Sequence, residues 1–191
     1  MICNYFNLKL PKAVIGITKQ AEIVAKLVEN KVIVESAKLR DSLLQQGFGE
    51  AIERKLVLDL NEALFLVEKK KIKVQKGRKL LSEAELLALG EKEDKRFYSK
   101  YLVFSDLRSK GYVVKTGYKF GFDLRVYPKG KKPGEVHTAW VINVCTQDEN
   151  FTMPEISRMV RLSGNLNTAL IQAVVDSENS INYYEIKRIL P

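Results

Sequence analysis

The sequence predicts an α/β protein with two domains, an N-terminal domain over residues 1–93 and a C-terminal domain over residues 94–191. A chain of 191 residues is long enough for two domains of roughly 90 residues each. Helix-start signals alternate along the chain with short runs of β-branched and aromatic residues. Residues 90–96 (GEKEDKR) are charged and contain no large apolar side chain, which is typical of a segment between domains.

The N-terminal domain is expected to begin with a small sheet. β-branched residues dominate short apolar runs that predict strands up to residue 35, including one at residues 14–17, although residues 20–30 also fit a helix. Leucines at helical spacing predict a helix over residues 36–46 that ends at the following glycines. Further short strands are expected at residues 53–58 and 72–74.

Capping boxes predict where the next two helices begin. Asp59 lies three residues before Glu62, so each side chain can bind the other residue's backbone N–H. Ser82 and Glu85 repeat this spacing, and their helix is expected to stop at Gly90.

The C-terminal domain is expected to open with a helix that ends at Gly111, because Phe97, Tyr101, Phe104 and Leu107 recur every three or four residues. The pattern then becomes extended and predicts strands at residues 112–116, 118–122, 124–127 and 136–144. A third capping box, Thr152 with Glu155, begins another helix. The apolar residues 169–175 predict a buried central strand, and residues 181–189 the last strand.

Composition argues against several classes of protein. No run approaches the roughly 18 apolar residues that span a membrane, and the N-terminal segment does not resemble a signal peptide. Two cysteines, Cys3 and Cys145, and a single histidine, His137, cannot supply a zinc quartet, so a structural zinc site is not expected. No metal or other cofactor is predicted for this chain. This cysteine usage favours a reducing, cytoplasmic setting.

The charge favours a polyanionic partner. The net charge is +9, from 32 Lys and Arg against 23 Asp and Glu, and nucleic acid is the polyanion that fits best. Lysine-rich surfaces also occur in proteins that bind no polyanion, so charge alone leaves both interpretations open.

Tyr127 and His137 form the candidate catalytic pair. They lie ten residues apart, at the facing ends of two predicted strands. Metal-independent RNA cleavage needs a base for the ribose 2′-OH, an acid for the leaving 5′-oxygen and a cation for the phosphorane. Histidine suits the acid, and tyrosine becomes a base when cations lower its pKa. A solvent-facing histidine and an ordinary strand aromatic are the alternatives.

Several segments resemble the archaeal tRNA-intron (tRNA-splicing) endonucleases. They include GYVVKTGYKFGFDLRVY, VHTAWVINV, RLSGNLNTALIQAVVD and INYYEI in the C-terminal half, and LVLDLNEALFLVEKKKIKV and YSKYLVFSDLRSKG before them. The resemblance implies a small N-terminal α/β domain and a C-terminal nuclease-like domain, whose central mixed sheet is flanked by helices. It also implies dimers or tetramers that cut precursor tRNA at a bulge-helix-bulge, without metal, to 2′,3′-cyclic phosphate and 5′-OH ends.

The family's active site is a Tyr, a His and a Lys. The first two match Tyr127 and His137, but Thr168 stands at the lysine position, and residues 162–176 contain no lysine. Losing one preorganised transition-state cation typically costs about 3–4 kcal/mol, or 10²–10³ in rate. Some family members are heterotetramers in which structural chains lack parts of this triad. The resemblance therefore favours a structural subunit that joins a catalytic subunit in an (αβ)2 heterotetramer.

Two other functions remain open at the sequence level. The chain could be a self-sufficient endonuclease that uses Tyr127, His137 and a cation from elsewhere, and the retained pair favours this. It could also be an RNA-binding or assembly protein on the same fold.

The resemblance also implies RNA-binding and subunit-interface residues. Arg161 and Arg188 match the two arginines that clamp a bulged base, although Arg161 is also explained as a cation near a helix end. Asp176 and Glu178 match a loop that inserts into a basic groove of another subunit, and a generic turn is the alternative. Tyr183 and Tyr184 lie in the last strand, which has the apolar character to pair with a partner's edge.

The basic runs at residues 69–79 and 129–132 have three possible roles. They fit contacts to the tRNA backbone, a groove that receives an acidic loop, or a solvated face.

Overall fold

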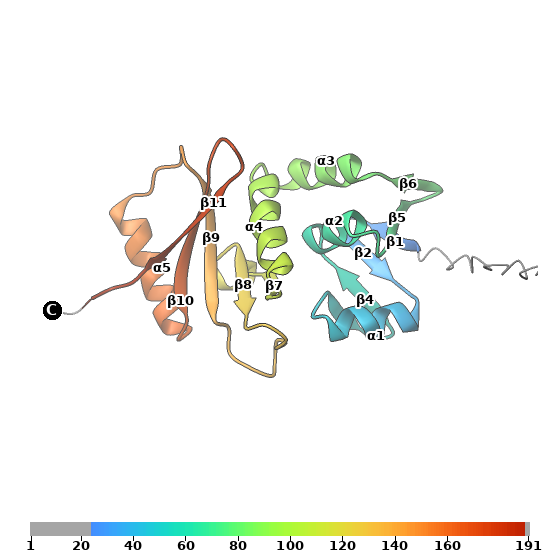
Figure 1. Cartoon of the computed structure of the whole chain (residues 1–191), viewed down its shortest axis with the longest axis horizontal. Helices are drawn as coiled ribbons and strands as arrows, with labels where there is room; N and C mark the ends of the chain where they lie inside the picture. Colours follow the sequence, from blue (N-terminus) through green and yellow to red (C-terminus); the bar gives the residue numbers. More distant parts are fainter. Residues whose placement is uncertain (1–23, 190–191) are drawn as a thin grey trace, which may run out of the picture.

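The computed structural model describes residues 24–189, which form two sheets with helices between and outside them (Figure 1). The strand expected at residues 14–17, Cys3 and the N-terminal segment judged for a signal peptide lie outside the described residues. In Figure 1, α4 (Phe97–Ser109) lies between the two sheets, and α5 (Met153–Asn165) lies on the far side of the C-terminal sheet. The fold is therefore a mixed α/β structure, as the sequence predicts.

The N-terminal sheet has six strands in the order β3-β4-β2-β1-β5-β6. They are β1 (Val24–Val28), β2 (Lys31–Val34), β3 (Glu50–Ile52), β4 (Lys55–Leu58), β5 (Lys73–Lys76) and β6 (Lys79–Leu81). Only β1 and β5 pair in parallel among these strands. The helical alternative for residues 20–30 is therefore wrong where the structure describes them. The expected strand at residues 53–58 is present as β4, but it begins at Lys55, because Glu53 adopts a φ of 54° in the turn of the β3–β4 hairpin.

Three helices accompany this sheet, α1 (Ala37–Gln45), α2 (Leu60–Glu68) and α3 (Glu83–Glu93). The capping boxes predicted at Asp59 and Ser82 are both confirmed. The expected stop at Gly90 is wrong, because α3 continues to Glu93. Gly90 has a packing role instead: a Cβ at this position would lie 2.3 Å from the ring of Phe97, so glycine lets α4 begin close against α3.

The C-terminal sheet has five strands in the order β11-β10-β9-β8-β7. They are β7 (Val113–Thr116), β8 (Leu124–Tyr127), β9 (Trp140–Thr146), β10 (Ala169–Val175) and β11 (Ile181–Ile186). β9 and β10 run parallel, and the other pairs are antiparallel. β10 is a central strand with the predicted bounds, and the capping box at Thr152 begins α5 as predicted.

Three strand predictions in this half need correction. The strand expected at residues 118–122 is wrong, because Tyr118–Phe120 form a turn of 3-10 helix. A Cβ on Gly117 would lie 2.7 Å from the Phe122 carbonyl oxygen, and Gly121 has a φ of 75°, so the two glycines close a tight loop. The strand expected to begin at Val136 begins instead at Trp140, and the last strand ends at Ile186 rather than at residue 189.

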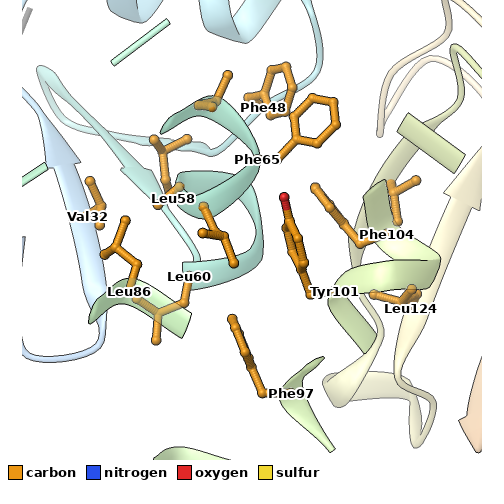
Figure 2. Close-up of a cluster of buried hydrophobic side chains, with 14 of the residues drawn as sticks. Val32, Phe48, Leu58, Leu60, Phe65, Leu86, Phe97, Tyr101, Phe104 and Leu124 are labelled. Carbon is orange, nitrogen blue, oxygen red and sulfur yellow. The ribbon is translucent and has the colours of Figure 1, made fainter. Parts of the chain in front are cut away.

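One apolar core joins the two sheets. Figure 2 shows side chains of α2 and α4 meeting between them, and the Phe65 and Phe104 rings lie edge to face with centroids 5.9 Å apart. The same core includes Leu124 of β8, which is 1% exposed. The two halves therefore hold each other in a defined position. The predicted division into domains at residue 93 stays a prediction.

Candidate functional site

The candidate site lies at one end of three neighbouring strands of the C-terminal sheet. Trp140 of β9 pairs with Val126 of β8 on one side and with Ala169 of β10 on the other. One step further along, Tyr127 and Thr168 therefore lie at the same end of the sheet, on either side of Ala139. The backbone N–H of Ala139 donates to the Val126 carbonyl oxygen at 2.8 Å, which extends the β8–β9 pairing to this point.

Tyr127 and Thr168 also share a face of the sheet. Alternate residues of a strand point to opposite faces. Val126 packs into the core beside α4, so its neighbour Tyr127 belongs to the opposite face. Thr168 alternates in step with Leu170, which packs against Met159 of α5. The register and the alternation together bring these two positions to the α5 face. Tyr127 is 4% exposed, so its ring is buried at the strand end.

His137 precedes β9 in the loop that follows Tyr127. It is exposed and lies three residues before Trp140, so the expectation that it opens the strand is wrong. A bridge between Pro133 and Val136 precedes it. Its loop is nevertheless tied to the site, because the Thr168 hydroxyl lies 3.1 Å from the Thr138 carbonyl oxygen and 3.0 Å from that of Ala139, to which it donates.

The position of Thr168 is set by the end of α5. Asn167 adopts a φ of 49°, and the Thr168 N–H donates to the Ser163 carbonyl oxygen at 3.1 Å, which closes the helix in a left-handed turn. The Thr168 side chain is neutral and is engaged with the backbone of the His137 loop. It therefore supports that loop and brings no positive charge to the site.

Two cations flank Tyr127 in the sequence, and each lies against an aromatic ring. The Arg125 guanidinium lies 4.5 Å from the centroid of the Phe120 ring, and its Nε donates to the Thr116 carbonyl oxygen at 3.1 Å. Lys129 Nζ lies 5.2 Å from the centroid of the Tyr112 ring. These cation–π contacts engage both groups within the chain.

The two predicted RNA-binding arginines are exposed. Arg161 lies on the outer side of the last turns of α5, and Arg188 follows the end of β11. Leu162, next to Arg161, lies close to the Tyr118–Phe120 turn, since a Cβ on Gly121 would be 3.5 Å from Leu162 Cδ1. Tyr118 in that turn is 90% exposed, so its aromatic ring lies at the surface. Sequence reasoning did not single out Tyr118, because it expected a strand there.

The four predicted interface residues divide into two pairs. Asp176 Oδ1 accepts from the N–H groups of Glu178 and Ser180, so it builds the β10–β11 turn. The Tyr183 hydroxyl donates to Asp106 Oδ2 on α4 at 2.7 Å. Burial and the Asp106 carboxylate raise the pKa of Tyr183 well above its usual range. Glu178 and Tyr184 are exposed.

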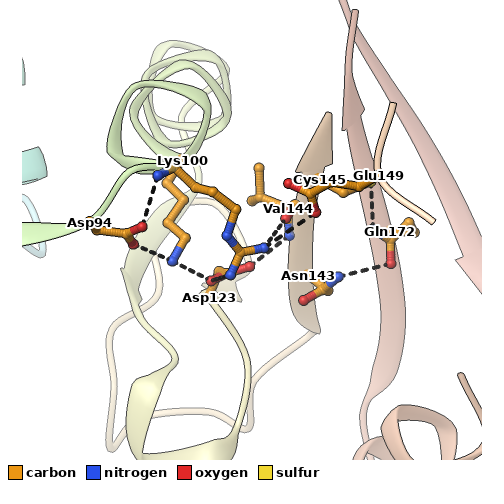
Figure 3. Close-up of polar contacts among 9 residues, drawn as sticks. Asp94, Lys100, Asp123, Asn143, Val144, Cys145, Glu149 and Gln172 are labelled. Carbon is orange, nitrogen blue, oxygen red and sulfur yellow. Dashed lines mark hydrogen bonds and ion pairs between the residues drawn. The ribbon is translucent and has the colours of Figure 1, made fainter. Parts of the chain in front are cut away.

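A polar network that the sequence did not reveal lies at the other end of β8 and β9 from Tyr127 and Trp140 (Figure 3). Asp123, just before β8, accepts from Lys100 Nζ at 2.6 Å and from the Val144 N–H at 2.8 Å. Arg96 donates to the Val144 carbonyl oxygen at 2.9 Å. Lys100 also pairs with Asp94 at 2.5 Å. These contacts fasten the start of α4 to β8 and β9, and their partners are too distant in sequence to be recognised from a local pattern.

The comparisons with known proteins agree with this architecture. The model of the tRNA intron endonuclease catalytic C-terminal domain matches residues 97–183, and that of the tRNA intron endonuclease N-terminal domain matches residues 23–87. The chain therefore belongs to the tRNA intron endonuclease family.

Its relatives include proteins named tRNA-splicing endonuclease. One from Thermococcus onnurineus is 40% identical over 163 residues, covering 85% of this chain and 94% of that protein. One from Methanothermobacter thermautotrophicus is 38% identical over 145 residues, covering 75% and 84%. One from Methanococcus maripaludis is 33% identical over 165 residues, covering 86% and 93%.

Residues 24–189 contain neither a candidate membrane span nor a metal-binding cluster. No described helix is both long and apolar enough to cross a membrane. No three His, Cys, Asp or Glu side chains in this range are arranged to hold a metal ion.

Proposed function

We propose that this chain is a structural subunit of a cytoplasmic tRNA-splicing endonuclease. The assembly would cleave precursor tRNA at bulge-helix-bulge introns and leave 2′,3′-cyclic phosphate and 5′-OH ends. The observation that carries the proposal is Thr168. It occupies the strand-end position where the chemistry needs a cation, and its hydroxyl is bound to the carbonyls of Thr138 and Ala139.

The chemical consequence is an incomplete site. His137 can protonate a leaving oxygen, and Tyr127 can take a proton only if a cation favours its ionised form. The same cation would stabilise the phosphorane, and its loss lowers the rate by about 10²–10³. The nearby Arg125 and Lys129 are engaged with Phe120 and Tyr112. The chain by itself should therefore cut RNA poorly.

The proposal assigns the assembly role to the outer edge of the C-terminal sheet. β11 pairs only with β10 within the described sheet, so its other edge has unpaired backbone groups. Tyr184 is 56% exposed on this strand, and Glu178 is exposed in the turn before it. A catalytic subunit would pair with this edge and receive the turn in an (αβ)2 heterotetramer. Arg161 and Arg188 would hold an unpaired base of the RNA.

The test is cleavage of a bulge-helix-bulge RNA in EDTA, by this chain alone and then mixed with a homologue that has Tyr, His and Lys. The proposal expects cleavage by the mixture at a rate above that of the homologue alone, and only slow cleavage by this chain alone. Efficient cleavage by this chain alone would rule the structural role out. A mixture that neither forms a complex nor exceeds the homologue's own activity would do the same.

A self-sufficient endonuclease is the second candidate, and the placement of Tyr127 and the His137 loop at one strand end favours it. A chain without a catalytic task has no chemical reason to keep this pair. In this case a His137→Ala variant should lose at least about 10² of the activity of the chain alone. A His137→Ala chain that cuts as fast as the unmodified chain would remove this candidate.

A further inference from the structure

The N-terminal half has a basic groove far from the candidate active site. A hollow of about 1370 Å³ lies between α1, the end of α2, and the β5–β6 hairpin with the start of α3. Four of its lining residues are lysines, Lys38, Lys70, Lys71 and Lys73, whereas Glu83 is the acidic residue among those that line it. The floor between them is apolar and includes Leu39, Val67 and Ile72.

A second, smaller hollow of about 330 Å³ continues this surface. Leu81 lines both hollows, so they adjoin. Lys76, Lys79 and Lys92 line the second hollow together with Glu85. Glu85 is already engaged, because it caps α3 through Ser82 and pairs with Lys79. The two hollows together, called the lysine groove below, thus have seven lining lysines and two lining glutamates.

Local structure explains why these lysines are concentrated around the β5–β6 hairpin. Seven of the 11 residues from Lys69 to Lys79 are basic. In β5, Val74 is buried while Lys73 and Lys76 are exposed; the two lysines alternate to opposite faces of the strand, and Lys73 lines the first hollow and Lys76 the second. The β5–β6 turn then exposes Arg78 at the same end of the molecule.

Lys70 occupies a position that ordinarily favours another residue. It follows the last turn of α2 at a φ of 54°, and its N–H donates to the Val67 carbonyl oxygen at 2.8 Å. Glycine or asparagine is usual at such a left-handed position, and other residues lose stability there. A lysine at this site therefore places a positive charge at the groove, although its left-handed backbone conformation is less stable than that of a glycine.

We propose that the lysine groove binds the sugar–phosphate backbone of the RNA substrate outside the cleavage site, which rests on the proposed function in RNA processing. The charge complementarity is that of a long polyanion, because the lysines extend across two adjoining hollows. The apolar floor suits the faces of riboses or unstacked bases between phosphates. An acidic peptide of a partner protein would fit less readily, because its carboxylates would have to be spread over the same length.

The test is the affinity of the full chain for a fluorescently labelled precursor tRNA transcript, measured over a series of salt concentrations. The variant combines Lys38→Gln, Lys70→Gln and Lys76→Gln. Losing three phosphate contacts should weaken binding about tenfold or more near 0.15 M salt and reduce the salt slope by about 2–3. The matched control, Lys31→Gln with Arg54→Gln and Lys55→Gln, removes the same charge from β2 and the β3–β4 hairpin and should change affinity much less.

Three further measurements keep the outcome clear. A Lys→Arg change at the same three groove positions should keep the affinity, and circular dichroism should show that all variants fold alike. If the groove variant and the control variant lost the same affinity for RNA, the proposal would be overturned, because net charge alone would explain the binding. Unchanged RNA binding combined with lost binding of an oligoglutamate peptide would identify a site for an acidic partner instead.

The binding experiment involves no cleavage, so it separates this inference from the proposed function. Weaker RNA binding by the groove variant would stand even if the mixture with a catalytic homologue showed no added cleavage. Conversely, a groove variant that binds RNA normally would overturn the RNA-binding role of the groove. The proposed structural role in splicing would not be affected.

Discussion

The junction between the two sheets and the open end of the C-terminal sheet use charge in opposite ways. At the junction, Lys115 of β7 is 8% exposed, and its Nζ donates to Glu62 Oε1 at 2.8 Å and to the Gly49 carbonyl oxygen at 2.7 Å. At the open end, the neutral Thr168 hydroxyl contacts the backbone carbonyl oxygens of Thr138 and Ala139. A buried ion pair therefore holds the two halves together, whereas the Thr168 side chain contributes no charge at the strand end.

The largest expected effect comes from breaking the ion pair at the junction. Lys115→Met keeps the length of the side chain but leaves Glu62 buried without its cation. The free energy of unfolding should fall by about 3–5 kcal/mol, because an uncompensated buried charge is costly. Urea unfolding measures this change, and Lys119→Met at an exposed position should stay within about 0.5 kcal/mol. A small effect at Lys115 would mean that the junction does not depend on this pair.

The second effect tests the missing cation directly. Thr168→Lys should raise metal-independent cleavage of a bulge-helix-bulge RNA by the chain alone by about 10²–10³. Thr168→Met, which adds length without charge, should give no gain. The gain should disappear when His137→Ala is added to Thr168→Lys. No gain from the lysine would show that the site lacks more than a cation.

The third effect is a pH dependence of stability at the junction. Burial and the neighbouring Glu62 carboxylate raise the pKa of Asp59 to about 7. The folded state then holds a proton that the unfolded chain releases near pH 4, so stability should fall as pH rises from about 4 to about 7, by at most about 1.4 kcal/mol per pH unit. Asp59→Asn should remove this part of the slope while it keeps an oxygen to cap α2. An identical slope in the variant would assign it to another group.

The smallest effect concerns the outer edge of the C-terminal sheet. Tyr183→Phe removes the hydroxyl that donates to Asp106, and the free energy of unfolding should fall by about 1–2 kcal/mol. Tyr184→Phe, one residue along the same strand and exposed, should change it by less than about 0.5 kcal/mol. Equal losses at both positions would contradict the division of β11 into an inner and an outer face.

Features that depend on near neighbours could be predicted from the sequence. The capping boxes at Asp59, Ser82 and Thr152 join residues three apart, so their patterns are complete within one turn of helix. The near-continuous apolar run of β10 likewise predicts a buried strand without reference to distant residues. The strand predicted at residues 118–122 is wrong, because the backbone at Gly117 closes tightly against the Phe122 carbonyl. A pattern of β-favouring residues does not show such a close backbone approach.

The sequence by itself determined the two α/β halves, the basic character, the candidate residues Tyr127 and His137, and the threonine at position 168. Only the tertiary structure decided which strand ends meet, where the Thr168 hydroxyl goes, and that Lys115 is a junction residue. The Lys115–Glu62 pair joins positions 53 residues apart, and Asp123 meets Lys100 and Val144 from other elements. Such partners are chosen by packing and by the need to pair buried charges, and neither requirement leaves a local pattern in the chain.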